Sequence, residues 1–246
     1  MKILAIESSS LVASAAIVND DILVAEYTVN HKVTHSQTLL PMIDEILTMT
    51  QTDKRSIDAI AVSGGPGSYT GLRIGSATAK GLGMALDIPL IHVPTLDAMA
   101  YNAYGYAGLV CPIMDARRSQ VYTGIYEFSD GKFNILLENS AITFDELMEK
   151  LDVLNTSGKK VMFIGDGIPV FKDRIDEHFK GTGYELAPAS MNRQRAASVA
   201  VLGPAVQIRK PGVLYRNSAG LLFSEELKTM SVRQKDLSYE KGKLIV

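Results

Sequence analysis

The sequence predicts an α/β protein of two similar lobes, and three observations support this prediction. The chain has 246 residues, of which 46% are hydrophobic, which is enough for one large domain or for two lobes with separate cores. Both halves show the same order of expected elements, namely three strands, a helix, a strand and a second helix. In the first half, a glycine-rich loop joins a strand directly to a helix, as expected where strands and helices alternate.

The elements of the first half follow from apolar runs and turn residues. Strands are expected at residues 2–7, 13–18 and 22–30, with polar turns between them. A helix capped by Ser36, with Pro41 in its first turn, is predicted from the residues that fall on one helical face: Leu39, Leu40, Ile43, Ile46 and Leu47. A strand at 59–63, a helix at 70–86, a strand at 90–93 and a short helix near 96–104 complete this half.

The second half repeats that order. Strands are expected at 109–114, 120–128 and 133–140, and Thr143 and Glu146 have the spacing of a capping box that opens a helix to about residue 151. A strand at 161–164 and a helix at 169–178 follow. We therefore expect an N-terminal lobe at 1–105 and a C-terminal lobe at 106–246. A late helix near 195–208, strained by Pro204, is expected to pack back on the first lobe.

Composition limits the compartment and the partners. The formal net charge is −2, so the chain has no overall electrostatic footprint for nucleic acid, and a partner is expected to supply much of the grip on any RNA. The single cysteine, Cys111, lies in an apolar run and is expected to be a buried free thiol. Glu7 interrupts the short apolar start, and no apolar stretch is long enough for a membrane helix. These features predict a soluble, cytoplasmic protein.

The glycine-rich loop is the strongest local signal for binding. Gly64, Gly65 and Gly67 follow a strand, and a helix begins at once. Glycine permits close approach of the backbone, and a helix start favours an anion. Gly65 and Gly67 are therefore candidates for a phosphate or carboxylate cradle, although a tight connection without a ligand would explain them equally well. The loop is neither a Walker A loop nor a dinucleotide fingerprint.

Two polar turns are candidates for a nucleotide site. Glu7, Ser8 and Ser9 follow the first strand, and Asp115 and Arg117 occupy the matching position in the second half. If these turns face each other, they enclose a nucleotide cleft between the lobes. The alternative is that each is an ordinary polar hairpin turn.

The helix after the glycine loop carries small residues every fourth position: Gly71, Gly75, Ala79 and Gly83. A glycine inside a helix costs about 1 kcal/mol relative to alanine, so close packing along this stripe must offset that cost. The stripe packs either inside the subunit or against a partner helix.

The histidines give weak signals. His31 and His35 have the spacing of metal ligands on a helix, but they are expected to straddle the end of a strand and the start of a helix. No catalytic Ser-His-Asp or Cys-His set can be assembled from the sequence, and we predict neither catalytic residues nor a metal site.

Four segments together resemble one protein family. They are LAIESS at 4–9, HSQTLLP at 35–41, GPGSYTGLRIG at 65–75 and DARR at 115–118. In order and length, the chain resembles the TsaB (YeaZ-type) proteins, which belong to the bacterial machinery that makes threonylcarbamoyladenosine in tRNA.

The resemblance implies an actin-like, Hsp70-like (ASKHA) fold of two ribonuclease-H-like lobes. It also implies a non-catalytic partner of the transferase TsaD, with TsaE as a further ATPase, and a homodimer when the chain is alone. No cofactor is expected for this chain by itself, although ATP or ADP could lie at the complex interface. The histidine pair that binds metal in TsaD aligns with Thr95 and Met99 here, and both are poor ligands for hard divalent metals.

The resemblance further places the two N-lobe helices at the interface with TsaD. The residues expected there are Leu39, Leu40, Ile43, Gly71, Leu72, Gly75, Ala79 and Gly83. Two other functions are alternatives. An independent actin-like kinase or ATPase would use Glu7 or Asp115 to bind magnesium, and a metallopeptidase would need the metal ligands that this chain lacks.

Overall fold

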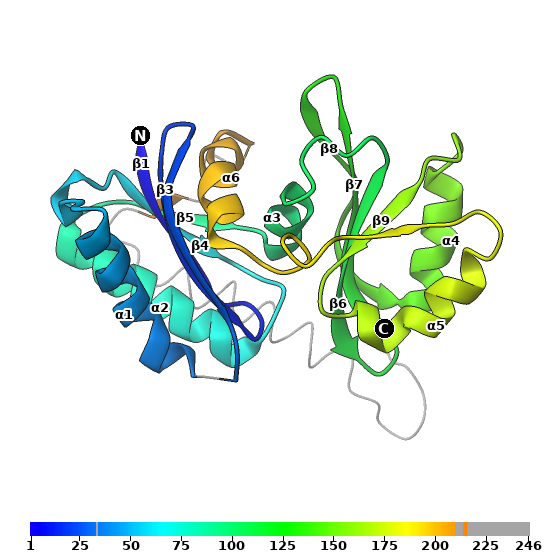
Figure 1. Ribbon diagram of the computed structural model, residues 1–246, viewed down its shortest axis with the longest axis horizontal. Helices are drawn as coiled ribbons and strands as arrows, with labels where there is room; N and C mark the ends of the chain where they lie inside the picture. Colours follow the sequence, from blue (N-terminus) through cyan, green and yellow to red (C-terminus); the bar gives the residue numbers. More distant parts are fainter. Residues whose placement is uncertain (33, 210–213, 216–246) are drawn as a thin grey trace.

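The computed structural model describes residues 1–32, 34–209 and 214–215, with side chains to residue 204. Two lobes lie side by side, each built around its own sheet (Figure 1). Both lobes show three strands, a helix, a strand and a helix in that order, which confirms the predicted α/β class and the duplicated pattern.

The N-terminal lobe contains a six-stranded sheet in the order β11-β5-β4-β1-β2-β3. The strands are β1 (Lys2–Glu7), β2 (Val12–Asn19), β3 (Ile22–Asn30), β4 (Ala59–Ser63), β5 (Leu90–Val93) and β11 (Leu214–Tyr215). Because β1, β4 and β5 run parallel, their carboxyl ends meet at one edge, where the glycine loop begins.

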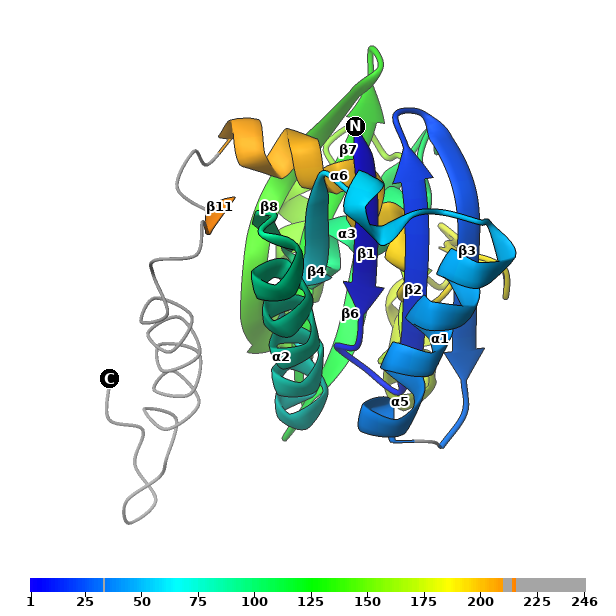
Figure 2. The ribbon, with the colours of Figure 1, turned by 90° about the vertical axis from the view of Figure 1, so that its left-hand side faces the viewer.

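Helices cover both faces of this sheet. The helices α1 (His35–Met49) and α2 (Tyr69–Leu86) lie side by side on one face (Figure 2). Leu39 and Ile43 pack there against Leu4 and Ile6. The late helix α6 (Ala196–Arg209) covers the other face, where Val199 packs in the core cluster that contains strands β1, β4 and β5. A short 3₁₀ helix, Lys54–Ser56, precedes β4.

The C-terminal lobe contains a five-stranded sheet in the order β10-β9-β6-β7-β8. The strands are β6 (Leu109–Arg117), β7 (Gln120–Ser129), β8 (Lys132–Thr143), β9 (Val161–Ile164) and β10 (Glu185–Leu186). The helices α4 (Phe144–Leu154) and α5 (Ile168–His178) cover one face, and α3 (Thr95–Tyr101) covers the other.

The lobes meet through α3 and α6, which lie between the two sheets (Figure 1). Asp97 of α3 is buried and accepts hydrogen bonds from the Tyr126 hydroxyl at 2.8 Å and from the Asn139 amide at 3.0 Å. Ser198 of α6 donates a hydrogen bond to the Asn102 amide oxygen at 2.5 Å. Polar contacts therefore join the first lobe to the second at a buried junction.

One predicted helix cap is present in the structure, and another is not. The Thr143 hydroxyl accepts a hydrogen bond from the Glu146 N–H at 3.2 Å, which confirms the predicted cap. The prediction for α1 is wrong, because its cap position is Thr34 and the helix begins at His35. Pro41 consequently lies inside the helix, where it removes one backbone hydrogen bond rather than filling an unpaired first-turn position. The residues after Pro211 lie outside the described part, apart from β11.

Within the described residues, no helix combines the length and the apolar character that crossing a membrane requires.

Candidate functional site

The turn after β1 is built from buried polar side chains. Glu7 is 1% exposed, and one of its carboxylate oxygens accepts a hydrogen bond from the Ser9 N–H at 2.6 Å. Burial raises the pKa of the Glu7 carboxyl above its ordinary value, and hydrogen bonds from Ser9 and Ser63 oppose that rise. The carboxyl group is therefore part of the buried turn and does not face solvent.

The glycine loop packs directly onto this turn. A Cβ atom on Gly67 would lie 2.2 Å from the Ser9 carbonyl oxygen, and one on Gly71 would lie 2.1 Å from the Ser8 carbonyl oxygen. The Ser68 N–H donates a hydrogen bond to the Ser9 carbonyl at 2.6 Å. The close approach that these glycines permit is therefore made to the chain's own β1–β2 turn. The predicted phosphate cradle at Gly65 and Gly67 stays a prediction.

A buried polar cluster surrounds Ser10 in the same turn. His35 Nε2 donates a hydrogen bond to the Ser10 carbonyl at 2.8 Å, and the Ser10 hydroxyl donates one to Gln194 Oε1 at 3.0 Å. Three side-chain atoms here are buried without a hydrogen-bond partner: Ser9 Oγ, His35 Nδ1 and Gln194 Nε2. Such atoms gain free energy from a water or a ligand group that bonds to them. The Ser10–Gln194 hydrogen bond thus joins this turn to the 191–195 segment.

The matching turn of the second lobe contains charged residues. Asp115, near the end of β6, accepts hydrogen bonds from the Arg117 N–H at 2.8 Å and from the Arg117 guanidinium at 3.1 Å. Arg117, Arg118 and Ser119 all adopt positive φ, with values of 69°, 52° and 60°. The side chain of Arg117 is 87% exposed, so its guanidinium remains open to solvent beside Asp115.

Two further charged residues lie at this turn. Asp166 follows β9, the parallel neighbour of β6, and its Oδ1 atom is buried without a hydrogen-bond partner. Burial raises the pKa of Asp166, Arg193 opposes this rise, and the charge of Asp115 adds to it. Arg193 also donates a hydrogen bond to the Gly165 carbonyl at 3.2 Å. The segment with Arg193 and Gln194 therefore contacts both the β1–β2 turn and the loop after β9.

Thr95 and Met99 are used in packing. The Thr95 hydroxyl accepts a hydrogen bond from the Gly65 N–H at 3.1 Å, and the Thr95 N–H donates one to the Gly65 carbonyl at 2.8 Å. Met99 is fully buried, and its Cε lies 3.1 Å from the position of a Cβ on Gly165. His31 is exposed, whereas His35 binds Ser10. In the part of the chain that the structure describes, no three His, Cys, Asp or Glu side chains gather where a metal ion could bind.

Seven of the eight residues predicted at the partner interface, on α1 and α2, are buried inside the subunit, so the small-residue stripe packs within the chain. A Cβ on Gly75 would lie 2.1 Å from Ser8 Oγ, and one on Gly83 would lie 2.8 Å from Leu90 Cδ2. Leu39, Ile43, Leu72 and Ala79 are each at most 3% exposed. Of the eight predicted residues, Leu40 alone is accessible to a partner, because the stripe faces the chain's own sheet.

The face of α2 that remains accessible carries three small residues in a second row. Ala77, Gly81 and Ala85 follow Arg73 at every fourth position, and all four are exposed. No heavy atom lies within 4 Å of a Cβ built on Gly81. Large apolar side chains border this face: Tyr69 is 52%, Met84 61% and, on α1, Leu40 52% exposed. We call these seven residues the α1–α2 outer face.

Sequence reasoning missed several of these residues for a physical reason. Small residues occur in rows on two opposite sides of α2, so their spacing does not reveal which side is buried. Gln194, Asp166 and Arg193 are far from the two turns in the sequence, and no local motif marks them. A weak signal for Asp166 was present in the glycines on either side of it.

Comparison with known proteins gives consistent results. The family model described as TsaD, tRNA N6-adenosine threonylcarbamoyltransferase, matches residues 24–210. A Bacillus subtilis relative named tRNA threonylcarbamoyladenosine biosynthesis protein TsaB is 34% identical over 203 residues, which are 82% of this chain and 87% of the relative. The protein of the same name from Escherichia coli is 39% identical over 129 residues, covering 52% and 55% of the two chains.

A solved structure of YeaZ from Pseudomonas aeruginosa superimposes with a TM-score of 0.72 at 24% identity, over 87% of this chain and 95% of that chain. This likeness shows that the two proteins share their fold.

Proposed function

Because the chain belongs to the TsaB family of tRNA threonylcarbamoyladenosine biosynthesis proteins, we propose that it is the non-catalytic partner of a TsaD-type transferase. The family places the chain in this biosynthesis. The proposed role is to activate the partner, which attaches the threonylcarbamoyl group to adenosine 37 of tRNA.

The α1–α2 outer face is the observation that supports a partner role. Exposed apolar side chains that gather on one face mark an interaction site more often than scattered ones do. Tyr69, Met84 and Leu40 supply apolar area, and Ala77 and Gly81 let a partner helix approach closely. On this proposal a TsaD-type helix packs across α2, and in isolation a second copy of the chain occupies the same face. A TsaE-type ATPase joins the complex, and tRNA is held mainly by the partner.

The test is tRNA modification in vitro with threonylcarbamoyl-adenylate supplied and a TsaD-type partner added or withheld. We expect activity only when both proteins are present. Gly81→Arg should abolish this activity and the binding of the partner, because the new side chain projects from the outer face while nothing inside the subunit opposes it. The matched control is Val153→Arg on α4, a position that is 73% exposed on the other lobe.

Two results would contradict the proposal. Activity from this chain without the partner would mean that it has a catalytic site of its own. Normal activity of Gly81→Arg would mean that the partner binds elsewhere.

A second candidate function is nucleotide binding between the two polar turns, and the unpartnered Ser9 Oγ and Gln194 Nε2 atoms favour it. Both groups can donate hydrogen bonds to a phosphate oxygen, and the exposed Arg117 guanidinium can add a charge-assisted bond. The glycine loop contributes little to this nucleotide site, because the β1–β2 turn packs directly against its glycines.

Calorimetry with ATP or ADP tests this candidate function, and Ser9→Ala is expected to weaken nucleotide binding. Equal affinity of Ser9→Ala and the wild-type chain would count against the site.

A further inference from the structure

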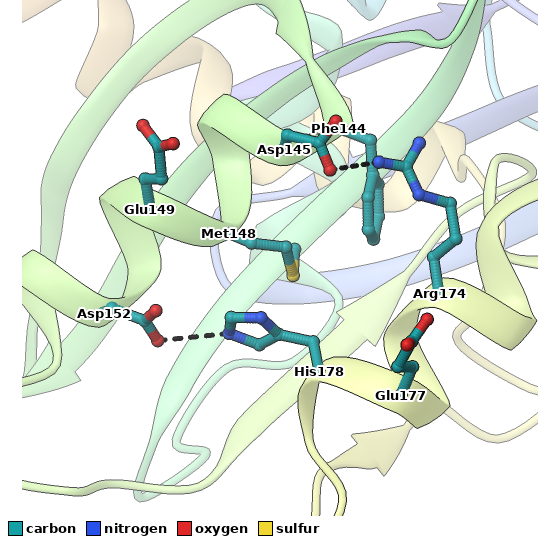
Figure 3. A pocket seen from close by; sticks show the side chains of 8 residues that line it. All are labelled: Phe144, Asp145, Met148, Glu149, Asp152, Arg174, Glu177 and His178. Atoms are coloured by element: carbon teal, nitrogen blue, oxygen red, sulfur yellow. Dashed lines mark hydrogen bonds and ion pairs between the residues drawn. The ribbon is translucent and has the colours of Figure 1, made fainter.

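A groove of about 440 Å³ lies between α4 and α5, on the face of the second sheet that is opposite α3 (Figure 3). Phe144 and Met148 form its apolar floor, and both are nearly buried. Its walls carry Asp145, Glu149 and Asp152 from α4 and Arg174, Glu177 and His178 from α5. The groove thus combines an apolar floor with an excess of acidic side chains.

One ion pair and one histidine–carboxylate hydrogen bond inside the groove leave two carboxylates over. Arg174 pairs with Asp145 and lies over the Phe144 ring, with 4.7 Å between guanidinium and ring centroid. His178 lies 3.1 Å from Asp152. Among the residues that the structure describes, Glu149 and Glu177 have no ion-pair partner, and Figure 3 shows them on opposite sides of Met148.

The charges of the chain are divided unevenly along its length. Residues 1–208 carry 17 Lys or Arg and 23 Asp or Glu, whereas residues 209–246 carry eight and four. The helices α4 and α5 alone carry seven acidic and three basic side chains. The two helices that form the groove therefore account for much of the acidic excess of residues 1–208, and the basic excess lies in residues 209–246.

We propose that the groove between α4 and α5 binds the basic carboxyl-terminal segment of the same molecule, residues 228–243. This segment carries Lys228, Arg233, Lys235, Lys241 and Lys243 against two acidic residues. Arg233 lies 18 positions after Tyr215, and at about 3.3 Å per residue these steps span up to about 60 Å. A compact chain of this length is about 46 Å across, so the basic residues from Arg233 onward lie far enough along the chain to reach the groove.

The groove itself shows how a cation is held there. Arg174 combines a carboxylate partner with the face of an aromatic ring. Glu149 and Glu177, on opposite sides of Met148, can each offer a carboxylate to a further cation. Acidic side chains close to an apolar floor favour binding of a basic segment at this groove over its binding elsewhere on the chain.

Zero-length carbodiimide cross-linking of the full-length chain tests the proposal, with mass spectrometry to identify the joined residues. The reaction joins a lysine to a carboxylate only when the two are in contact. We expect the tail lysines to be joined to Glu149 or Glu177 about tenfold more often than to Glu45 on α1, as expected for two or three added surface ion pairs. Glu45 is a matched control because it is also an exposed helical glutamate.

Charge reversal provides the second measurement. Glu149→Lys combined with Glu177→Lys should abolish the cross-links from the tail to Asp145 and Asp152, and Glu45→Lys should leave them unchanged. Mixing isotopically labelled and unlabelled chains separates contacts within one molecule from contacts between two. Cross-links spread evenly over exposed carboxylates, or found only between two copies, would overturn the proposal.

Discussion

Alanine at two glycines of the same helix, Gly71 and Gly81, should change stability in opposite directions. Both lie in α2, but a Cβ at Gly71 would lie 2.1 Å from the Ser8 carbonyl oxygen, whereas a Cβ at Gly81 would meet no heavy atom within 4 Å. The comparison therefore tests which side of α2 faces the sheet.

The magnitudes follow from helix propensity and packing. Gly81→Ala removes the conformational cost of glycine and should raise the free energy of unfolding by about 0.5–1 kcal/mol. At Gly71 the neighbouring atom is backbone, held by the Ser8 N–H bond to Ser63 at 3.3 Å and by the Ser8 hydroxyl bond to the Gly71 carbonyl at 2.9 Å. Displacing it costs about 1–3 kcal/mol for overpacking and about 1 kcal/mol for the weakened hydrogen bond.

Calorimetry and denaturant unfolding of the isolated chain provide the assay. A change of 1 kcal/mol shifts the Tm of a chain of this size by about 2–4 °C. We therefore expect Gly81→Ala to melt about 2 °C higher, and Gly71→Ala about 5–10 °C lower. Measurements at two protein concentrations separate this effect from pairing of two copies through the outer face.

Either of two results would refute the reasoning. Wild-type stability of Gly71→Ala would mean that α2 does not rest on the Ser8 turn. A clear loss of stability in Gly81→Ala at low protein concentration would mean that the outer face of α2 is covered within the chain.

Three further outcomes are expected. Tyr126→Phe removes the hydroxyl that binds the buried Asp97 and should destabilise the chain by about 1–3 kcal/mol, measured by denaturant unfolding; an unchanged midpoint would mean that the lobe junction does not depend on this bond. Burial raises the folded-state pKa of Glu7 above its ordinary value of 4.5, so the stability that Glu7 contributes is complete below pH 4.5 and is lost as the pH rises through the raised value. Glu7→Gln stays neutral, and its free energy of unfolding relative to wild type should therefore increase with pH above 4.5; a constant difference would contradict this. Burial raises the pKa of Cys111 to about 12, so a thiol reagent at neutral pH should label it only after unfolding, and rapid labelling of the native chain would show that the thiol is accessible.

The two lobes and nearly all of their elements can be predicted from the sequence alone, because strand and helix periods are local properties. Residues 2–7 and 161–164 read as strands from their apolar runs alone, and the structure places strands there. The start of α1 was misjudged because Ser36 and Thr34 are both acceptable caps, and the packing of His35 against Ser10 selects the earlier start.

The tertiary structure alone decided which side of α2 is buried and which residues meet at the two polar turns. Small residues lie on two opposite sides of α2, so only its contact with Ser8 and Leu90 distinguishes the inner stripe from the outer face. Gln194 reaches Ser10 across 184 positions of sequence, and Arg193 reaches the loop after β9. Such contacts arise when distant segments fold against each other, and no local pattern of residues encodes them.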